Sequence, residues 1–262
     1  MDRYLDRDGA RLRWRLEGAG PALVLLHGWA LDLGSWDAVV PYLARNFTVL
    51  RFDRRGFGLS AGQPDIQRNV EDLVALLEAA GMASAAVLGM SQGARFAIHF
   101  ALRCPESTSA LLLDGAPEIE AESELPLDDY RQLLESSGAA ALRQQILAHP
   151  LMQLHTADAS ARAALRDSVG RYLGLDLLHP ATRAHAPDLR RIGCPTLVFN
   201  GSLDSEARRE AGMQLQSAIT GAARIELPGA GHLAMLDQPE AYAHAVAEFV
   251  RAHCKESNAD GR

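Results

Sequence analysis

VLGMSQGARFA, residues 87–97, is the stretch that decides the fold of this 262-residue chain. An apolar run that ends at Leu88 predicts a buried strand, and apolar residues with helical spacing follow Ser91. Between them lies a Gly-x-Ser-x-Gly pentapeptide, Gly89 to Gly93, which predicts a sharp strand-to-helix turn. Such a turn needs small flanking residues because the strand and the helix approach closely there. The Ser91 hydroxyl is then held at the carboxyl edge of a sheet, in front of a helix N-terminus.

Composition and charge narrow the class of protein. Hydrophobic residues make up 48% of the chain, which is ample for the core of one large domain. The net charge of −7 argues against partners such as nucleic acid or an anionic membrane. The three cysteines show no CxxC spacing, so we expect reduced thiols and no metal site. We find no signal-peptide pattern and no apolar run that could span a bilayer, and we therefore expect a cytoplasmic protein.

Apolar runs alternate with helical patterns on both sides of the turn at residues 89–93, which we call the elbow. A hairpin is predicted over residues 3–17, where Asp8-Gly9 is a turn signal. Further strands are predicted at residues 22–26, 47–52, 85–88, 110–113, 196–199 and 224–227. Helices are predicted at residues 35–45, 66–80, 92–103, 206–219 and 239–252. This alternation predicts an α/β fold with a mostly parallel sheet covered by helices on both faces.

The rhythm changes between Pro117 and Asp188, where the sequence shows helical patterns and no convincing strand. Helices are predicted there at residues 127–135, 139–148 and 159–173. We therefore expect a helical cap, residues 117–188, inserted into a core formed by residues 1–116 and 189–254. The polar tail, residues 255–262, is expected to be disordered.

A serine hydroxyl needs a base, an acid that orients the base, and donors for the oxyanion that forms. Parallel sheets place such groups at the carboxyl ends of their strands. His232 follows the last predicted strand in a Gly-Ala-Gly-His segment and is the candidate base for Ser91. Asp204 follows the strand before it and is the candidate acid. Asp114, at the end of the strand after the elbow, is the rival acid, although an aspartate after a strand is often only a helix cap or a turn former.

The oxyanion donors are expected to be backbone N–H groups. One is the N–H of Gln92, directly after the nucleophile, and the other is the N–H of Trp29, in the loop after a neighbouring strand. His27 precedes a glycine turn and is expected to make a structural hydrogen bond rather than act as a base. Met90 and Leu233 flank the candidate catalytic groups in sequence and are expected to give a substrate pocket apolar walls.

The chain resembles the α/β-hydrolase fold superfamily over nearly its whole length, and most of all its small capped serine esterases and enol-lactonases. Four segments carry the resemblance: HGW at 27–29, DxRGxGxS at 53–60, GxSxG at 89–93 and GxGHLxxLxxPE at 229–240. It implies an α/β-hydrolase fold with an inserted helical cap, and the order Ser91, Asp204, His232 is the triad order of this superfamily.

The sequence also departs from the pattern of the superfamily. Many relatives carry a second glycine where this chain has Ala94, and many carry a proline a few residues after the acid. Here Asp204 is followed by Ser-Glu-Ala, which leaves the choice between Asp204 and Asp114 open. Epoxide hydrolases and haloalkane dehalogenases of this fold use an aspartate at the position of Ser91, which counts against both activities.

The residues and the resemblance together imply a serine hydrolase without metal or cofactor that cleaves a small carboxylic ester or lactone through an acyl-enzyme. The expected partner is that small molecule, and the chain is expected to be a monomer or a homodimer. Carbon–carbon bond hydrolases, acyltransferases and perhydrolases share the same triad. A ligand receptor with very slow turnover is the alternative from another class.

Overall fold

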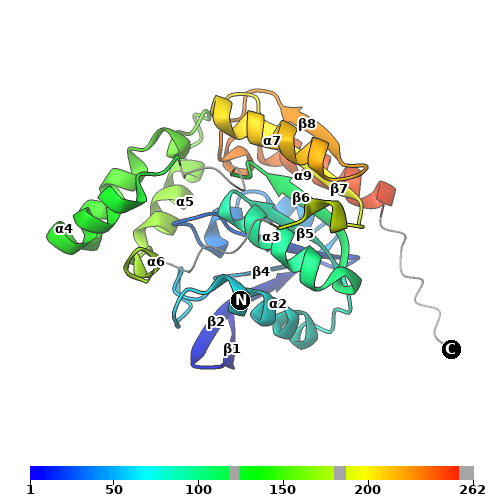
Figure 1. Ribbon diagram of the computed structural model, residues 1–262, viewed down its shortest axis with the longest axis horizontal. Helices are drawn as coiled ribbons and strands as arrows, with labels where there is room; N and C mark the ends of the chain where they lie inside the picture. The colour runs from blue at the N-terminus through cyan, green and yellow to red at the C-terminus, as the bar shows by residue number, and fades with distance from the viewer. Residues whose placement is uncertain (118–123, 180–186, 254–262) are drawn as a thin grey trace.

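The computed structural model describes residues 1–117, 124–179 and 187–253 of the chain. Its centre is an eight-stranded sheet with the strand order β1-β2-β4-β3-β5-β6-β7-β8 (Figure 1). β1 pairs antiparallel with β2, and β2 pairs antiparallel with β4, whereas the five pairs from β4 to β8 are parallel. The strands are β1 Arg3–Arg7, β2 Ala10–Glu17, β3 Ala22–Leu26, β4 Thr48–Phe52, β5 Ala85–Met90, β6 Thr108–Asp114, β7 Thr196–Gly201 and β8 Ala223–Leu227. The mostly parallel sheet predicted from the sequence is confirmed.

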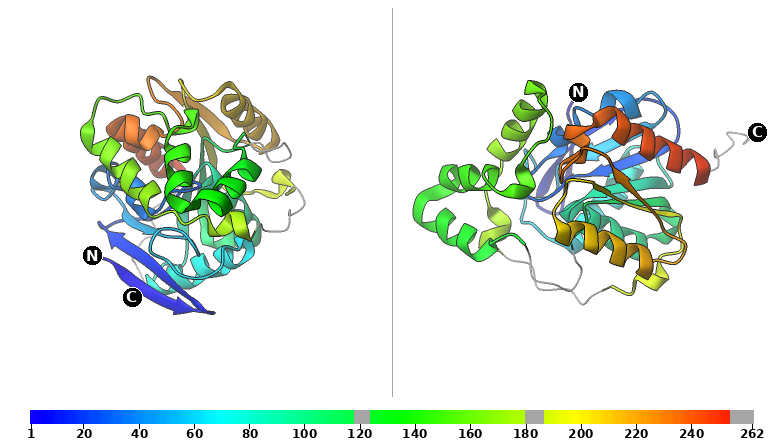
Figure 2. Two further views of the ribbon diagram at one scale, coloured as in Figure 1. Left: turned by 90° about the vertical axis from the view of Figure 1, so that its left-hand side faces the viewer. Right: turned by 90° about the horizontal axis from the view of Figure 1, so that it is seen from above.

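Helices cover both faces of the sheet (Figures 1 and 2). Successive side chains of a strand point to opposite faces, so each central strand feeds two apolar clusters. Leu25 of β3 belongs to the cluster under α1 and α9, and Leu26 belongs to the cluster under α2, α3 and α7. These helices, with the short α8, are α1 Val40–Leu43, α2 Ile66–Ala79, α3 Gln92–Arg103, α7 Glu206–Ala218, α8 Ala234–Asp237 and α9 Pro239–His253.

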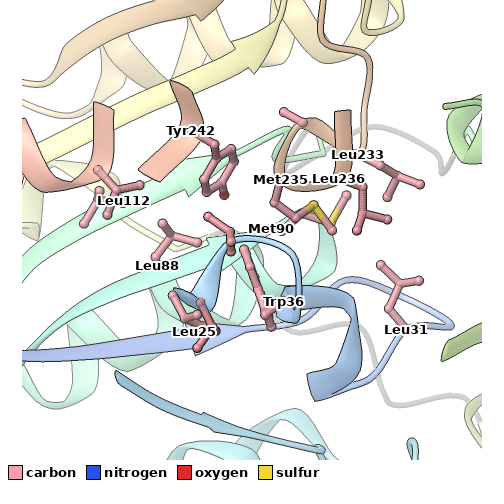
Figure 3. Close-up of a cluster of buried hydrophobic side chains, with 14 of the residues drawn as sticks. Leu25, Leu31, Trp36, Leu88, Met90, Leu112, Leu233, Met235, Leu236 and Tyr242 are labelled. Atoms are coloured by element: carbon pink, nitrogen blue, oxygen red, sulfur yellow. The ribbon is translucent and has the colours of Figure 1, made fainter. Parts of the chain in front are cut away.

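The cluster under α9 runs from the middle of the sheet to the end of β5 (Figure 3). Leu25, Leu88 and Leu112 come from three adjacent strands and lie in one cluster with the buried rings of Trp36 and Tyr242. The same cluster continues to Met90, Leu233 and Leu236 at the carboxyl edge of the sheet. The apolar core therefore supports the turn on which Ser91 lies.

The single helix predicted over residues 35–45 is wrong. The structure has a 3₁₀ helix, η1 Leu33–Trp36, and a separate short helix, α1 Val40–Leu43. Pro41 lies in the first turn of α1, where its missing N–H costs no hydrogen bond, so a new helix starts there. The Asp32 carboxylate begins η1 by accepting a hydrogen bond from the Gly34 N–H.

The described residues between β6 and β7 form several helices, and we call residues 124–179 the helical insert. These elements are α4 Leu127–Leu147, η3 Pro150–Met152, α5 Ala159–Gly170 and α6 Leu175–Leu178. Gly138 has a φ of 79° and divides α4 into the two parts that the sequence predicted. α5 ends at Gly170 rather than at residue 173, and α6 was not predicted.

The insert, which contains α4, α5 and α6, projects beyond one side of the sheet (Figures 1 and 2). Two further 3₁₀ helices, η2 Pro105–Ser107 and η4 Leu189–Arg191, precede β6 and β7. Within the described ranges, no helix combines the length and the apolar character needed to cross a bilayer. The tail predicted to be disordered, residues 255–262, lies outside the described residues.

Candidate active site

Ser91 occupies a strained turn between β5 and α3. Its φ of 53° and ψ of −118° lie outside the regions that non-glycine residues ordinarily adopt, which costs on the order of 1–3 kcal/mol. A Cβ atom on Gly89 would lie 2.2 Å from the Gly93 carbonyl oxygen, and one on Gly93 would lie 2.2 Å from the Leu26 carbonyl oxygen. The two glycines are required by the close approach of strand and helix that the sequence predicted.

His232 and Asp204 meet at the carboxyl ends of β8 and β7. His232 Nδ1 lies 3.1 Å from Asp204 Oδ1 and 3.1 Å from Asp204 Oδ2, and both side chains are buried. Burial alone would raise the pKa of Asp204. The charge and hydrogen bond of His232, the Ser205 N–H and the Arg208 charge outweigh it and hold that pKa below its usual value. Asp204 is thus an ionised carboxylate in contact with the imidazole.

The rival acid, Asp114, has a different environment. Its carboxylate at the end of β6 accepts a 3.0 Å hydrogen bond from the Tyr242 hydroxyl of α9. Burial raises the pKa of Asp114 well above its usual value, and the nearby Asp204 charge adds to this. The Ser91 N–H binds only the backbone oxygen of Asp114, at 2.7 Å. The structure therefore brings His232 to Asp204 and turns the Asp114 side chain toward the core.

A small pocket is lined in part by Ser91 and His232. Met90 lines it, as expected from the sequence, but Leu233 is not among the lining residues in the described part of the chain. The Leu233 side chain is fully buried in the apolar cluster of Figure 3, so it supports the site from below. The residues that line the pocket are apolar except for Ser91 and His232, and they are Trp29, Leu31, Met90, Ser91, Leu125, Leu151, Met152 and His232.

The loop after β3 is held by the side chain of His27. His27 Nδ1 donates to the Gly28 carbonyl at 2.8 Å, and His27 Nε2 accepts from the Arg54 N–H at 3.1 Å. Burial and the Arg54 charge lower the pKa of His27 well below its usual value, so the ring is neutral. These contacts are the structural hydrogen bonding expected for His27. The same loop presents Trp29, while Gln92 stands at the first position of α3, where a helix N–H has no partner within the helix.

Residues 23–245 match the sequence profile of the Alpha/beta hydrolase family. The chain belongs to this family. A pimeloyl-[acyl-carrier protein] methyl ester esterase of Chromobacterium violaceum is 32% identical to it, over 89% of this chain and 95% of the relative.

Two solved structures resemble the hydrolase over almost its whole length. An enol-lactonase of Burkholderia xenovorans superposes with a TM-score of 0.82 at 26% identity, covering 95% of this chain and 99% of that one. A hydrolase of Pseudomonas aeruginosa gives a TM-score of 0.80 at 30% identity, covering 95% and 98%. The protein is thus an α/β hydrolase whose homologues are carboxylic ester hydrolases.

Arg208 is a neighbour of Ser91 that the sequence analysis missed. It lies in the first turn of α7, and its Nη1 atom donates to the Gly115 carbonyl at 3.1 Å and lies 3.5 Å from Ser91 Oγ. Its Nε atom donates to Glu124 of the insert, and Glu124 also accepts from Ser205 Oγ at 2.7 Å. Side chains in a helix lean toward its N-terminus, so an arginine four residues after a strand-end acid was a usable signal.

Polar side chains fasten the insert to the hydrolase core at three more places. Buried Asp32 binds Ser168 Oγ at 2.9 Å and pairs with Arg171, both on α5 or at its end. The Trp29 indole N–H donates to Asp176 of α6 at 2.8 Å. Asp237 accepts the backbone N–H groups of His155, at 2.6 Å, and of Gly231, at 2.8 Å. The insert is therefore tied to the loops that carry Trp29, Asp204 and His232.

Proposed function

We propose that this α/β hydrolase cleaves a small carboxylic ester or lactone, with Ser91 as nucleophile, His232 as base and Asp204 as acid. The observation that carries the proposal is the placement of Ser91 on a strained elbow in the same pocket as a His232 side chain bound to Asp204. The names of the two relatives, a methyl ester esterase and an enol-lactonase, support the same substrate classes.

The proposed reaction proceeds in two halves. Ser91 Oγ attacks the carbonyl carbon while its proton passes to His232 Nε2, and the carbonyl oxygen becomes an oxyanion held by the N–H groups of Gln92 and Trp29. The bond to the leaving oxygen then breaks, and His232 returns the proton to that oxygen. Water activated by His232 attacks the acyl-enzyme and releases the acid. Asp204 keeps the imidazole in the tautomer that accepts at Nε2.

Residues 117–188, which include the insert, are proposed to form a cap on a core of residues 1–116 and 189–254. Leu125, Leu151 and Met152 of the insert line the pocket that holds Ser91, which supports this role. A roofed pocket with apolar walls accepts a short acyl chain or a lactone ring. The substrate is therefore proposed to be a free small molecule rather than lipid at an interface.

A substrate panel tests the proposal. Purified protein is assayed with short-chain esters, five- and six-membered lactones and vinylogous diketones, and the Ser91→Ala variant is the matched control. Catalytic turnover of an ester or lactone that is lost in Ser91→Ala supports the proposal. Turnover of the diketones alone would make the protein a carbon–carbon bond hydrolase, and one equivalent of product per protein would make it a ligand receptor.

A further inference from the structure

Arg54 is a buried cation behind the loop that carries Trp29. It belongs to the glycine-rich segment 53–60, and only 3% of its surface is exposed. Burial lowers the pKa of Arg54 to about 10, and the negative charge of the nearby Asp176 opposes that lowering. The guanidinium therefore stays protonated near neutral pH. Nothing in the proposed triad chemistry uses this charge.

The contacts of Arg54 direct its charge at one peptide group. Arg54 Nη2 donates to the Gly28 carbonyl oxygen at 3.1 Å, and the guanidinium lies over the Phe57 ring, with 4.5 Å between Cζ and the ring centroid. Within the described residues, Arg54 Nε has no hydrogen-bond partner, and no carboxylate oxygen forms an ion pair with the guanidinium. The nearby Asp176 accepts instead from the Trp29 indole and the Tyr172 hydroxyl.

The Gly28 carbonyl and the Trp29 N–H belong to the same planar peptide group. That carbonyl accepts two hydrogen bonds, from Arg54 and from His27 Nδ1 at 2.8 Å. Donors at the carbonyl end polarise a peptide and make its N–H a stronger donor at the other end. We propose that Arg54 is a positioning residue that orients and polarises the Gly28–Trp29 peptide, so that the Trp29 N–H stabilises the oxyanion. This inference rests on the proposed function.

A purely structural role does not account for the charge. A buried cation without a contacting carboxylate costs desolvation energy, and an apolar side chain of similar length would fill the same space under Phe57 without that cost. The cost is offset when negative charge develops in the pocket, which happens in the transition state and not in the bound ester. The charge of Arg54 therefore acts on the rate of the chemical step more than on substrate binding.

Three variants separate charge, hydrogen bonding and packing. Arg54→Met removes the charge and the donor, Arg54→Gln keeps a neutral donor, and Arg54→Lys keeps a charged donor. We expect Arg54→Met to lower kcat by about 10–100-fold with KM changed less than about twofold, as for other groups that act on a site through a neighbour. Arg54→Lys should recover most of the loss and Arg54→Gln less. Affinity for a trifluoromethyl ketone, which forms an oxyanion on Ser91, should fall with kcat.

Arg55→Lys is the matched control, because Arg55 binds Asp72 with its Nε and Nη2 atoms and faces the β1–β2 hairpin. That change should lower the melting temperature and leave kcat and the ketone affinity unaltered. A loss in Arg54→Met that falls on KM, or that Arg55→Lys reproduces, would overturn the positioning role. So would a kcat in Arg54→Met equal to that of the wild type.

NMR of the peptide group gives a readout that does not depend on hydrolysis. Loss of the Arg54 donor should move the Trp29 amide ¹⁵N and the Gly28 carbonyl ¹³C resonances upfield, with Arg54→Lys closest to the wild type. Unchanged resonances would overturn the polarisation whatever the activity. If the wild type turned over no ester or lactone but the resonances moved as expected, the proposed function would be wrong while the polarised peptide would stand.

Discussion

The sheet and the helical insert are held in place by different sets of contacts. The central strands β3, β5 and β6 are buried along nearly their whole length, and apolar burial, which has no preferred direction, fixes their packing. The insert also packs apolar groups on the core, since the rings of Tyr130 and Tyr172 lie against Trp29. It adds directional polar contacts, and the core residues that make them are Trp29, Asp32, Arg208 and Asp237. The sheet thus decides where Ser91 lies, and apolar and polar contacts together hold the insert beside it.

The largest effect on activity should come from a substitution in the core, at Ser91. Ser91→Ala should remove ester hydrolysis almost completely, because losing one member of a triad costs on the order of a millionfold in kcat. The fold should survive, since the change removes a single hydroxyl from a supported turn. Steady-state assays with protein of checked melting temperature measure this. A residual activity above a few per cent of the wild type would contradict the elbow assignment.

Two aspartate changes at neighbouring strand ends form a matched pair. Asp204→Asn should lower kcat by about four orders of magnitude, since the amide favours the wrong imidazole tautomer. Asp114→Asn should cost far less, because the pKa of buried Asp114 is raised well above its usual value and Asn can still accept from Tyr242. The reverse ranking in kcat would move the triad acid to Asp114.

The loss of a contact between the insert and the core should change kcat less than the substitutions above, but it should be detectable by hydrogen exchange. Asp32→Ala leaves Ser168 and Arg171 of the insert without their buried partner, which weakens the attachment of α5 to the core. Hydrogen exchange should rise in α5 while the amides of β5 and β6 stay protected. Asp167→Ala, at an exposed position on the same helix, is the control. Equal loss of protection in the sheet would show that sheet and insert unfold as one unit.

The pH profile should report the imidazole and not the acid. The pKa of Asp204 is held below its usual value, so this carboxylate stays ionised on the acid side of neutrality. Activity should therefore fall as the solution is made more acid, by about tenfold per pH unit once the imidazole takes up a proton, because a protonated base cannot accept the Ser91 proton. An activity that stays flat from pH 5 to 9 would rule out a histidine base.

The smallest effects concern the roof of the pocket. Each methylene that fits should help by at most ~0.8 kcal/mol, or about fourfold in kcat/KM, until the space is full. The pocket is small, so a nitrophenyl-ester series should peak at short acyl chains and drop by about the octanoate. A preference for palmitate, or activation by a lipid interface, would show that the insert does not roof Ser91.

The same contrast explains what the sequence could and could not predict. Runs such as residues 22–26 and 196–199 are continuous and apolar, and both became strands at the expected place. The elbow could be recognised because backbone crowding there permits only glycine at 89 and 93. The single helix predicted across Pro41 was wrong because a proline in a first helical turn favours the start of a new helix. The short α8 was not predicted because it is too short to show a helical period.

Hydrophobic periodicity predicts local elements, so it could not show which residues from distant parts of the chain line the pocket. The roof of the pocket comes from Leu125, Leu151 and Met152, which lie far from Ser91 in sequence. Leu233 was expected to line the pocket because of its position next to His232. Adjacent residues in an irregular loop can face opposite ways, and its side chain turns into the core. Proximity along the chain is a poor guide where the wall of a site is supplied by an insertion.

The carboxylate of Asp237 links the insert to the catalytic loop. Its two oxygens hold the backbone of the insert at His155 and the backbone of the catalytic loop at Gly231. A displacement of the insert at His155 that preserves both bonds therefore also displaces Gly231, the residue before His232. The position of the insert and the position of the catalytic imidazole are thus coupled through one side chain.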